Sequence, residues 1–303
     1  MPQTSESRKA AAARRPAAPG AEAVFRVHPL TEKDGEQEVL DFLAERPGPT
    51  VVMRGLIRDN GFESPFNRGT FYACRDREGR LEGVALVGYH TFVEARTEGA
   101  LRAAAELARA ERGGHMVWGE REMVQGFWGH YAPGGQASRL FCRELLFEQR
   151  WPVRACEPVE GLRPATLEDL MLIMPVHAAM AYEECGVNPM DVDLNGFRLR
   201  CARRVENGRV WVLVERGELI FKADVAAETP ECTYVEGVYV EPASRQQGVG
   251  LRCLSQLGRT LLERSESLYA LVNEQNLVAQ SLFLKAGYRM RGYYDTIYLE
   301  RNQ

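Results

Sequence analysis

The chain has 303 residues, longer than one typical domain and short for three, so two domains are expected. Apolar residues make up 45% and charged residues 26%, an ordinary balance for a globular protein with sizeable cores. The net charge of −4 excludes the broad positive field that binding to a phosphate backbone requires, so nucleic acid is not an expected partner. No run approaches the ~20 apolar residues of a membrane-spanning helix, so no membrane partner is expected either.

The cysteines and the first residues of the chain bear on its location. Seven cysteines, an odd number, show no CxxC pair and no Cys/His cluster at zinc spacing, which indicates reduced cytoplasmic thiols and no metal. Residues 1–23 are rich in Ala and Pro and lack the apolar core of a secretory signal, so we expect a disordered tail. An organellar targeting peptide is the alternative, which Pro16 and Pro19 disfavour because they break the helix that it needs.

From Phe25 onward the pattern alternates between strand and helix periods. In the first half we expect, in chain order, a short strand from Phe25, a helix through Val39, Leu40 and Leu43, strands at 50–53, 69–74 and 81–89, a helix at 100–110, a strand at 115–118 and a helix through Val124, Phe127 and Trp128. The turn Asp76-Arg77-Glu78-Gly79 predicts a hairpin between two of these strands.

The second half repeats this order of elements. The segment at about 148–160 has two prolines and no sustained period, so the domain boundary is expected there. Thr166 then caps a helix, residues 208–226 form a second hairpin, and strand, helix, strand and helix follow. We therefore predict an α/β (α+β) protein with domains at 24–150 and 160–303, each a mixed, mostly antiparallel sheet flanked by helices.

The strongest chemical signal is a glycine loop between a strand and a helix. The strand 233–240 leads into Arg245-Gln246-Gln247-Gly248-Val249-Gly250 and then into a helix with leucines on its inner face. The first turn of a helix has unpaired N–H groups and a positive dipole end, so a pyrophosphate can bind there. The loop is neither the GxGxxG of a dinucleotide-binding crossover nor the GK[ST] of a P-loop. A structural turn that needs glycine for steric reasons is the alternative.

The spacing RxxGxG at Arg245–Gly250 resembles the acetyl-CoA loop of the GNAT acetyltransferase superfamily. The run 276–288, Asn-Leu-Val-Ala-Gln-Ser-Leu-Phe-Leu-Lys-Ala-Gly-Tyr, is similar to the second signature of that superfamily, NxxAxxxYxxxGF. The resemblance is specific over residues 161–299 and diffuse over 25–150. The closest type is a tandem protein in which a degenerate N-terminal GNAT-like half precedes a complete C-terminal one.

This resemblance implies acetyl-CoA as co-substrate and assigns the residues that hold it. The pantetheine arm would add to the sheet where its central strands separate, with main-chain contacts from Val238, Tyr239 and Val240. The pyrophosphate would lie on Gln246–Leu251, which spans Gln246, Gln247, Gly248, Val249, Gly250 and Leu251, with Arg245 at the rim. Asn276 would contact the coenzyme, and the alternative role for it is a helix N-cap.

Acetyl transfer to an amine requires a proton acceptor, because only the unprotonated amine attacks a thioester. The strand period of two places Tyr234, Glu236, Val238 and Val240 on one face, so Glu236 is the expected general base. Gly237 beside it is a candidate bulge, and a solvent-facing carboxylate is the alternative role for Glu236.

Two departures from the family pattern affect the chemistry. Phe283 stands where the family has its usual tyrosine acid, and Leu271 stands where some members have a second glutamate. Either the thiolate leaves without a protein acid, or another phenol replaces the missing one, with Tyr239, Tyr288 and Tyr294 as the candidates.

The acceptor pocket is expected around the segment 182–189. Glu183 and Glu184 would attract a cationic amine there, and a solvated helix end is the alternative role for them. Cys185 has no cationic neighbour in sequence that would favour an acyl-cysteine mechanism.

The corresponding stretch of the first half, 91–99, has one glycine and two acids, so that half is expected to bind no CoA. The predicted function is an N-acetyltransferase that uses acetyl-CoA in its C-terminal domain. The alternative is a non-catalytic acyl-CoA-binding or interaction protein, and the acceptor amine and the oligomeric state stay open.

Overall fold

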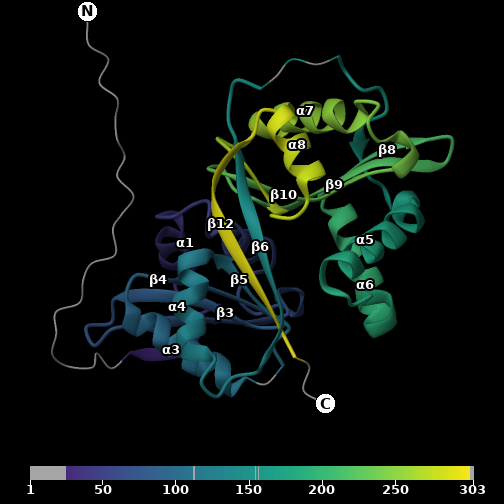
Figure 1. Cartoon of the computed structure of the whole chain (residues 1–303). Helices are drawn as coiled ribbons and strands as arrows, with labels where there is room; N and C mark the ends of the chain where they lie inside the picture. Colours follow the sequence, from purple (N-terminus) through teal and green to yellow (C-terminus); the bar gives the residue numbers. More distant parts are fainter. Residues whose placement is uncertain (1–24, 112, 154, 156, 301–303) are drawn as a thin grey trace, which may run out of the picture.

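The computed structural model describes residues 25–111, 113–153, 155 and 157–300 (Figure 1). The tail expected at residues 1–23 lies outside them. The first half contains β1 (Arg26–Pro29), α1 (Glu36–Ala44), α2 (Val51–Asn60), the 3₁₀ turn η1 (Pro65–Asn67), β2 (Gly69–Arg75), β3 (Leu81–Gly88), β4 (His90–Ala95), α3 (Glu98–Ala110), β5 (Met116–Glu120), α4 (Arg121–Tyr131) and β6 (Ser138–Gln149).

The second half repeats this series element by element. It contains β7 (Arg163–Pro164), η2 (Leu167–Asp169), α5 (Leu170–Cys185), α6 (Pro189–Glu206), β8 (Val210–Glu215), β9 (Glu218–Glu228), β10 (Thr233–Val240), η3 (Pro242–Ser244), α7 (Val249–Leu262), β11 (Leu268–Asn273), α8 (Leu277–Lys285) and β12 (Arg289–Leu299). Thr166 stands at the start of η2, and its N–H donates to the Asp169 carboxylate at 2.8 Å. The prediction of a repeated α/β unit with mixed, mostly antiparallel strands is confirmed.

The strands of the described residues form one continuous sheet in the order β1-β2-β3-β4-β5-β12-β6-β11-β10-β9-β8-β7. In this order the last strand of each half has crossed into the sheet of the other half. β12 pairs with β5 of the first half, and β6 pairs with β11 of the second. The long β6 and β12 lie side by side between the halves (Figure 1).

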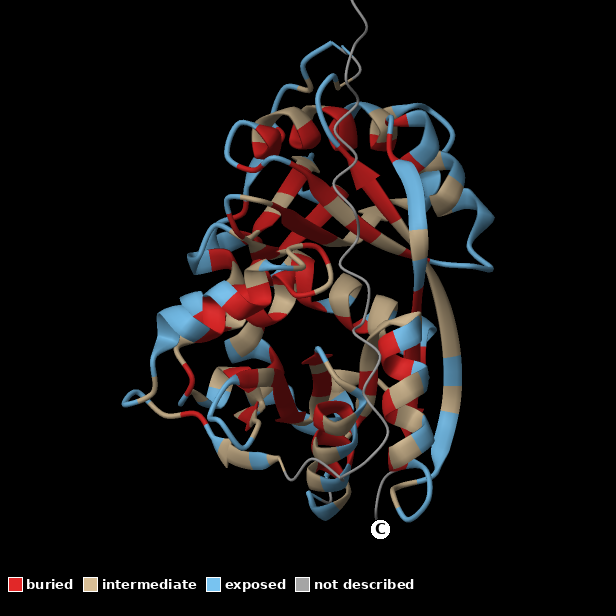
Figure 2. Cartoon of the chain, turned by 90° about the vertical axis from the view of Figure 1, so that its left-hand side faces the viewer, coloured by how far each residue is buried: buried red, intermediate tan, exposed pale blue. Residues whose placement is uncertain are grey.

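The hydrophobic cores show that the exchanged strands also contribute side chains. Ile297 and Leu299 of β12 pack with the first-half helices α3 and α4. Phe147 of β6 packs with α7 and α8 of the second half. Buried positions follow the strands and the inner faces of the covering helices (Figure 2). Each half therefore completes its core with a strand from the other, which explains how the repeat forms one molecule.

The strand expected at 50–53 is wrong, because these residues begin helix α2. Val51 and Val52 favour a strand by local propensity, but tertiary packing decides otherwise. The helix approaches β9 so closely that a Cβ on Gly55 would lie 2.7 Å from the Ala227 Cβ. The apolar side chains that resembled a strand bury themselves against the second half.

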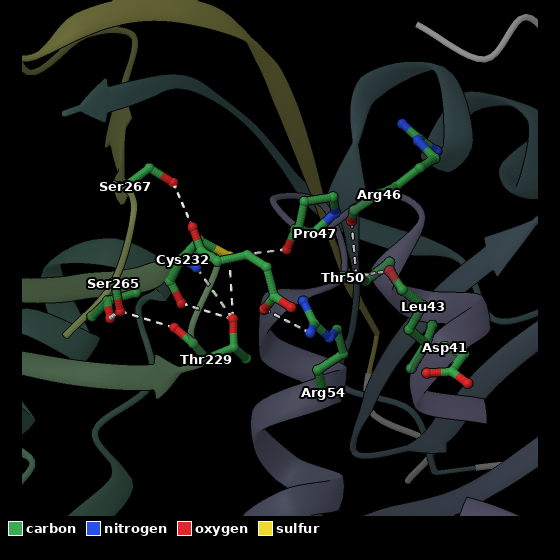
Figure 3. A network of polar contacts seen from close by, with 12 residues as sticks. Asp41, Leu43, Arg46, Pro47, Thr50, Arg54, Thr229, Cys232, Ser265 and Ser267 are labelled. Carbon is green, nitrogen blue, oxygen red and sulfur yellow. Dashed lines mark hydrogen bonds and ion pairs between the residues drawn. The ribbon is translucent and has the colours of Figure 1, made fainter. Parts of the chain in front are cut away.

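Polar contacts also join helix α2 and the loop before it to the turn between β9 and β10 (Figure 3). The Cys232 thiol donates to the Pro47 carbonyl at 3.1 Å. Arg54, only 1% exposed, pairs with Glu231 at 2.7 Å. The halves thus meet through a specific interface in addition to the shared strands. Among the described residues, no helix combines the length and apolar character needed to cross a membrane.

Candidate functional site

The centre of the second half contains an opening between two parallel strands. β10 and β11 pair only from Thr233 to Val235 on the first strand and from Leu268 to Ala270 on the second. Beyond these pairs β10 continues to Val240 and β11 to Asn273. The strands separate, so the β11-side main-chain edge of residues 238–240 is available to an extended ligand.

A bulge at Gly237 shapes this opening. Glu236 pairs with Asp224 and Tyr239 with Lys222, so β10 has one residue more than β9 across this stretch. Gly237 has φ +59°, and its carbonyl accepts from the Lys222 ammonium at 3.2 Å. The bulge turns the strand as it passes the opening.

The bulge also overturns one expectation about the strand faces. Val238 and Val240 do not share the face of Glu236, because they pack on the α7 side of the sheet. Glu236 lies on the opposite face, where Arg204 of α6 contacts it. A regular period of two fails here because the extra residue inverts the facing of every residue after it.

The glycine loop leads from η3 into the start of α7. Gln246 and Gly248 have φ values of +62° and +80°, the left-handed conformation that turns the chain into the helix. Within the described part of the chain, the N–H groups from Gln246 to Leu251 donate to no protein acceptor. This row of free donors at a helix start, bordered by the opening of the sheet, suits an anionic group.

Gly250 fixes the distance between this helix and the sheet. It is buried, and a Cβ there would lie 2.7 Å from Cγ2 of Val240. Two loop side chains fold back on their own backbone: Arg245 Nε donates to the Val240 carbonyl at 3.0 Å, and Gln247 Nε2 donates to the Ala243 carbonyl at 2.7 Å. The loop is therefore braced while its main-chain N–H groups stay open.

The second signature segment lies directly after β11. The Asn276 side chain accepts from the Ala279 N–H at 3.0 Å, so it caps helix α8 as the alternative role expected. Asn276 itself is exposed. Phe283 is buried, stacks on Phe147 with ring centres 5.9 Å apart and meets Tyr288 edge-on at 5.0 Å. The position of the expected acid is thus part of the core.

The three candidate replacement phenols lie in different places. Tyr288 is buried with Phe283, and its hydroxyl has no partner among the described residues. Tyr294 is buried on the opposite face of the sheet, beside Trp118. Tyr239 is half-buried on β10 at the opening itself. Burial raises the pKa of Tyr239, which favours its protonated form as a proton donor.

A buried ionic cluster contacts and supports the bulge at Gly237. Asp224, fully buried, contacts the Lys222 ammonium at 2.7 Å and His177 Nε2 at 2.9 Å. Although burial opposes ionisation, these neighbours hold the pKa of Asp224 well below its usual range. Burial and the charge of Lys222 lower the pKa of His177. Arg204 connects this cluster to Glu236 through a 2.9 Å ion pair.

A second group of polar side chains lies on the same face, at the exchanged strands. Glu144 of β6 accepts from Thr296 Oγ1 at 2.8 Å and from Trp118 Nε1 at 3.2 Å. Desolvation raises the pKa of Glu144 to about 7, and the charge of Glu184 adds to the shift. Glu144 was missed in the sequence because it precedes the second half and reaches this site only through strand exchange.

The two acids expected at the acceptor pocket differ in placement. Glu184, at the end of α5, accepts from the Tyr298 hydroxyl at 3.0 Å and so faces the exchanged strands. Desolvation raises the pKa of Glu184 although solvent still reaches its side chain. Glu183 is exposed beside it. Burial keeps the Cys185 side chain away from solvent, in agreement with a structural role.

The first half has a matching opening that is closed by its own side chains. β4 and β5 pair in parallel only at His90 and Thr91. Arg46 bridges the separated strands, with Glu94 at 2.9 Å on one side and Glu120 on the other. The small cavity that remains there is lined mainly by apolar side chains.

The start of helix α3, which corresponds to the start of α7, is covered as well. The Thr97 hydroxyl accepts from the Ala100 N–H at 3.2 Å. Glu98 contacts His130 at this end of the helix, and the Phe25 ring lies against Gly99, where it would clash with an added Cβ. An acid and an aromatic ring thus occupy the place where the second half presents free N–H groups.

The fold and the site define an α/β protein built from two copies of one unit, with an uncapped helix start beside separated strands in the second copy. Residues 177–288, which lie in the second half, match the acetyltransferase (GNAT) family. Members of this family are in general acetyl-CoA-dependent acetyltransferases. Comparison with curated proteins gave no match.

Solved structures show the same fold over nearly the whole chain. A Drosophila protein is 13% identical with a TM-score of 0.65, covering 91% of this chain and 99% of its own. A tandem GNAT protein from the clavulanic acid biosynthesis pathway is 13% identical with a TM-score of 0.59, covering 92% and 100%. A GNAT-family acetyltransferase from Colwellia psychrerythraea is 12% identical with a TM-score of 0.56, covering 91% and 100%. At these identities the likeness concerns the fold alone.

Proposed function

We propose that the protein transfers the acetyl group of acetyl-CoA to an amine, in its C-terminal half. The observation that carries this proposal is the opening between β10 and β11 beside the uncapped start of α7. An extended, hydrogen-bonding arm with an anionic end fits such a place, because the strand edge and the helix start present unpaired main-chain groups in sequence.

The proposed contacts follow the order of groups along acetyl-CoA. Val238, Tyr239 and Val240 pair with the amide groups of the pantetheine arm. The N–H groups of Gln246–Leu251 receive the pyrophosphate, and the guanidinium of Arg245 lies close enough to add charge. The exposed amide of Asn276 contacts the arm from the α8 side. The helix dipole of α7 strengthens the pyrophosphate contact.

Glu236 is one candidate for the base because it lies at the opening, on the face away from α7. The Arg204 guanidinium holds Oε1 of this carboxylate at 2.9 Å, which leaves its other oxygen to accept a proton directly or through a water. Glu184, and more weakly Glu183, would attract the cationic amine from the end of α5. Tyr239 is the phenol best placed to protonate the leaving thiolate.

We propose that the first half binds no CoA. Arg46 bridges its strand opening, and Glu98 lies at the helix start where a pyrophosphate would bind. Its proposed role is to supply strand β6 and to cover the acceptor face with α2. The proposed location, the cytoplasm, rests on the cysteine pattern of the sequence.

A non-catalytic acyl-CoA-binding protein is the second candidate function. The observation that favours it is Phe283, because the place of the usual acid is filled by a buried ring. Both candidate functions predict that the protein binds acetyl-CoA, and only the first predicts that it acetylates an amine.

The test is thiol release from acetyl-CoA in the presence of a panel of amines: putrescine, spermidine, ethanolamine, glucosamine, lysine and a peptide with a free N-terminus. We expect acetylation of at least one amine by the wild type. Gln247→Glu, which adds a negative charge at the exposed loop, should lower the rate at sub-saturating acetyl-CoA at least tenfold. Tight acetyl-CoA binding without turnover of any amine would favour the second candidate.

A further inference from the structure

We propose that Glu144, which the first half contributes on the exchanged strand β6, is the group that takes the proton from the acceptor amine. This inference rests on the proposed acetyl transfer and changes the assignment of the base. Three observations support it: the place of Glu144 in the sheet, the way its carboxylate is held, and its charged surroundings.

The first observation is position. Glu144 lies directly across from Asn273 of β11, the strand that forms the far wall of the opening. On its other side it lies across from Tyr294 of β12. Because directly paired residues share a face, Glu144 belongs to the same face of the sheet as Leu271, the place where some family members carry a second glutamate. The exchanged strand β6 thus places the carboxylate of Glu144 next to Leu271, the position at which this chain lacks the second glutamate.

The second observation is that one oxygen of the carboxylate is anchored and the other is free. Thr296 Oγ1 and Trp118 Nε1 both donate to Oε2 of Glu144. Oε1 accepts from no group among the described residues, and Glu144 retains some contact with solvent. A general base needs such an arrangement, because the anchor fixes its direction while the free oxygen receives the proton.

The third observation is the charge around it. No arginine, lysine or histidine forms an ion pair with Glu144 in the part of the chain that the structure describes, whereas Arg204 pairs with Glu236. The titratable groups that face Glu144 are Glu184 from α5, Glu236 and Tyr234 from β10, Tyr294 and Tyr298 from β12 and Cys142 from β6 itself. Desolvation and the nearby acids raise the pKa of Glu144 to about 7, which matches a base that works near neutral pH.

The chemical step balances with this assignment. The amine arrives as an ammonium ion and gives one proton to Oε1 of Glu144. Its lone pair then forms the C–N bond to the thioester carbonyl carbon, and the C–S bond breaks with both electrons passing to sulfur. The second proton lost by nitrogen ends on the thiol of CoA, and Glu144 returns its proton to solvent.

The assignment has a consequence for the tandem architecture. Trp118, which helps to anchor Glu144, also belongs to the first half, on β5. The catalytic carboxylate and one of its two anchors would therefore come from the half that binds no CoA. The exchange of β6 would serve catalysis as well as stability.

The test compares Glu144→Gln, Glu144→Asp and Glu236→Gln with the wild type, using the amine from the panel above that the wild type acetylates fastest. Glu122→Gln, on the exposed face of α4, is the control. We measure kcat/KM from pH 5.5 to 9 and the Kd of acetyl-CoA by calorimetry. Wild-type kcat/KM should rise about tenfold per pH unit up to about pH 7 and then level off, as expected for a base with this pKa.

Glu144→Gln should lower kcat/KM at pH 8 about 100-fold or more, remove the rise near pH 7 and leave the Kd of acetyl-CoA unchanged. Glu144→Asp should recover part of the rate and the rise. A Glu144→Gln enzyme with the wild-type rate and pH profile would overturn the inference while leaving the proposed transfer intact. If the wild type bound acetyl-CoA and acetylated no amine, the proposed function itself would fail, and the inference with it.

Discussion

Val235 of β10 and Ala270 of β11 form the last registered pair of the two central parallel strands of the second half. Past this pair the strands separate, and the bulge at Gly237 turns β10 away from its neighbour. The ionic cluster of Lys222 and Asp224 supports the bulge by holding the Gly237 carbonyl. The proposed coenzyme site therefore depends on the bulge at Gly237 and on the buried charges of Lys222 and Asp224 that support it.

Replacement of Gly237 by alanine should destabilise the protein and weaken acetyl-CoA binding. The added Cβ would lie 2.7 Å from Asp224 Oδ2 and 3.0 Å from Lys222 Nζ, at a φ of +59° that alanine disfavours. We expect a loss of about 2 kcal/mol in the free energy of unfolding, measured with urea. Gly129→Ala, at an open position of helix α4, is the matched control and should be neutral or stabilising by up to about 1 kcal/mol. Equal effects of the two changes would contradict the role given to the bulge.

Restoring the family tyrosine with Phe283→Tyr should not raise the rate of transfer. The ring is packed between Phe147 and Tyr288, so an added hydroxyl would be buried among apolar groups. We expect a loss of about 1–3 kcal/mol of stability in urea unfolding and no increase in kcat. A tenfold rise in kcat would show that this position reaches the leaving thiolate after all.

The hairpin of β8 and β9, strand β10, helices α7 and α8 and the glycine loop were predictable from the sequence, because hydrophobic period and turn residues report on local structure. Helix α6 and the closing strand β12 were not predicted. Helix α2 was not, since the contact of Gly55 with Ala227 outweighs the strand propensity of Val51 and Val52. The facing of Val238 was not either, because the bulge depends on packing against β9. Residues that only the exchange of β6 and β12 brings together leave no signal in the local sequence.

Glu144 illustrates this limit and allows a test that needs no substrate. Its pKa is raised from 4.5 to about 7 in the folded protein, mainly by desolvation. Its favourable contribution to the free energy of unfolding is therefore complete below about pH 4.5 and is lost as the pH rises through about 7. Gln keeps an oxygen for Thr296 and Trp118 and carries no charge. Glu144→Gln should therefore match the wild type near pH 4.5 and be more stable at pH 8 by about 3 kcal/mol.

The measurement is urea unfolding of both proteins at several pH values, with Glu122→Gln as the control that should show no such dependence. If the Glu144→Gln protein were less stable than the wild type at pH 8, the ionised carboxylate of Glu144 would stabilise the folded protein, which contradicts the prediction.

The contact between Arg54 and Glu231 should contribute to holding the halves together. Arg54 is buried, and its Nε and Nη1 atoms have no partner among the described residues, so Glu231 supplies its compensating charge. Glu231→Gln should cost about 1–2 kcal/mol, reduced because Glu231 is partly exposed. Arg54→Met should cost less, because it removes the buried charge and keeps much of the volume. Urea unfolding distinguishes the two, and a larger loss for Arg54→Met would contradict this reading of the pair.

Calorimetric titration with acetyl-CoA tests most directly that one half of this tandem protein holds the coenzyme on the loop before α7. We expect one acetyl-CoA per chain, at least tenfold weaker binding for Gln247→Glu, and unchanged binding for Glu98→Gln at the corresponding helix start of the first half. Two acetyl-CoA molecules per chain, or wild-type affinity in Gln247→Glu together with a loss in Glu98→Gln, would contradict the account.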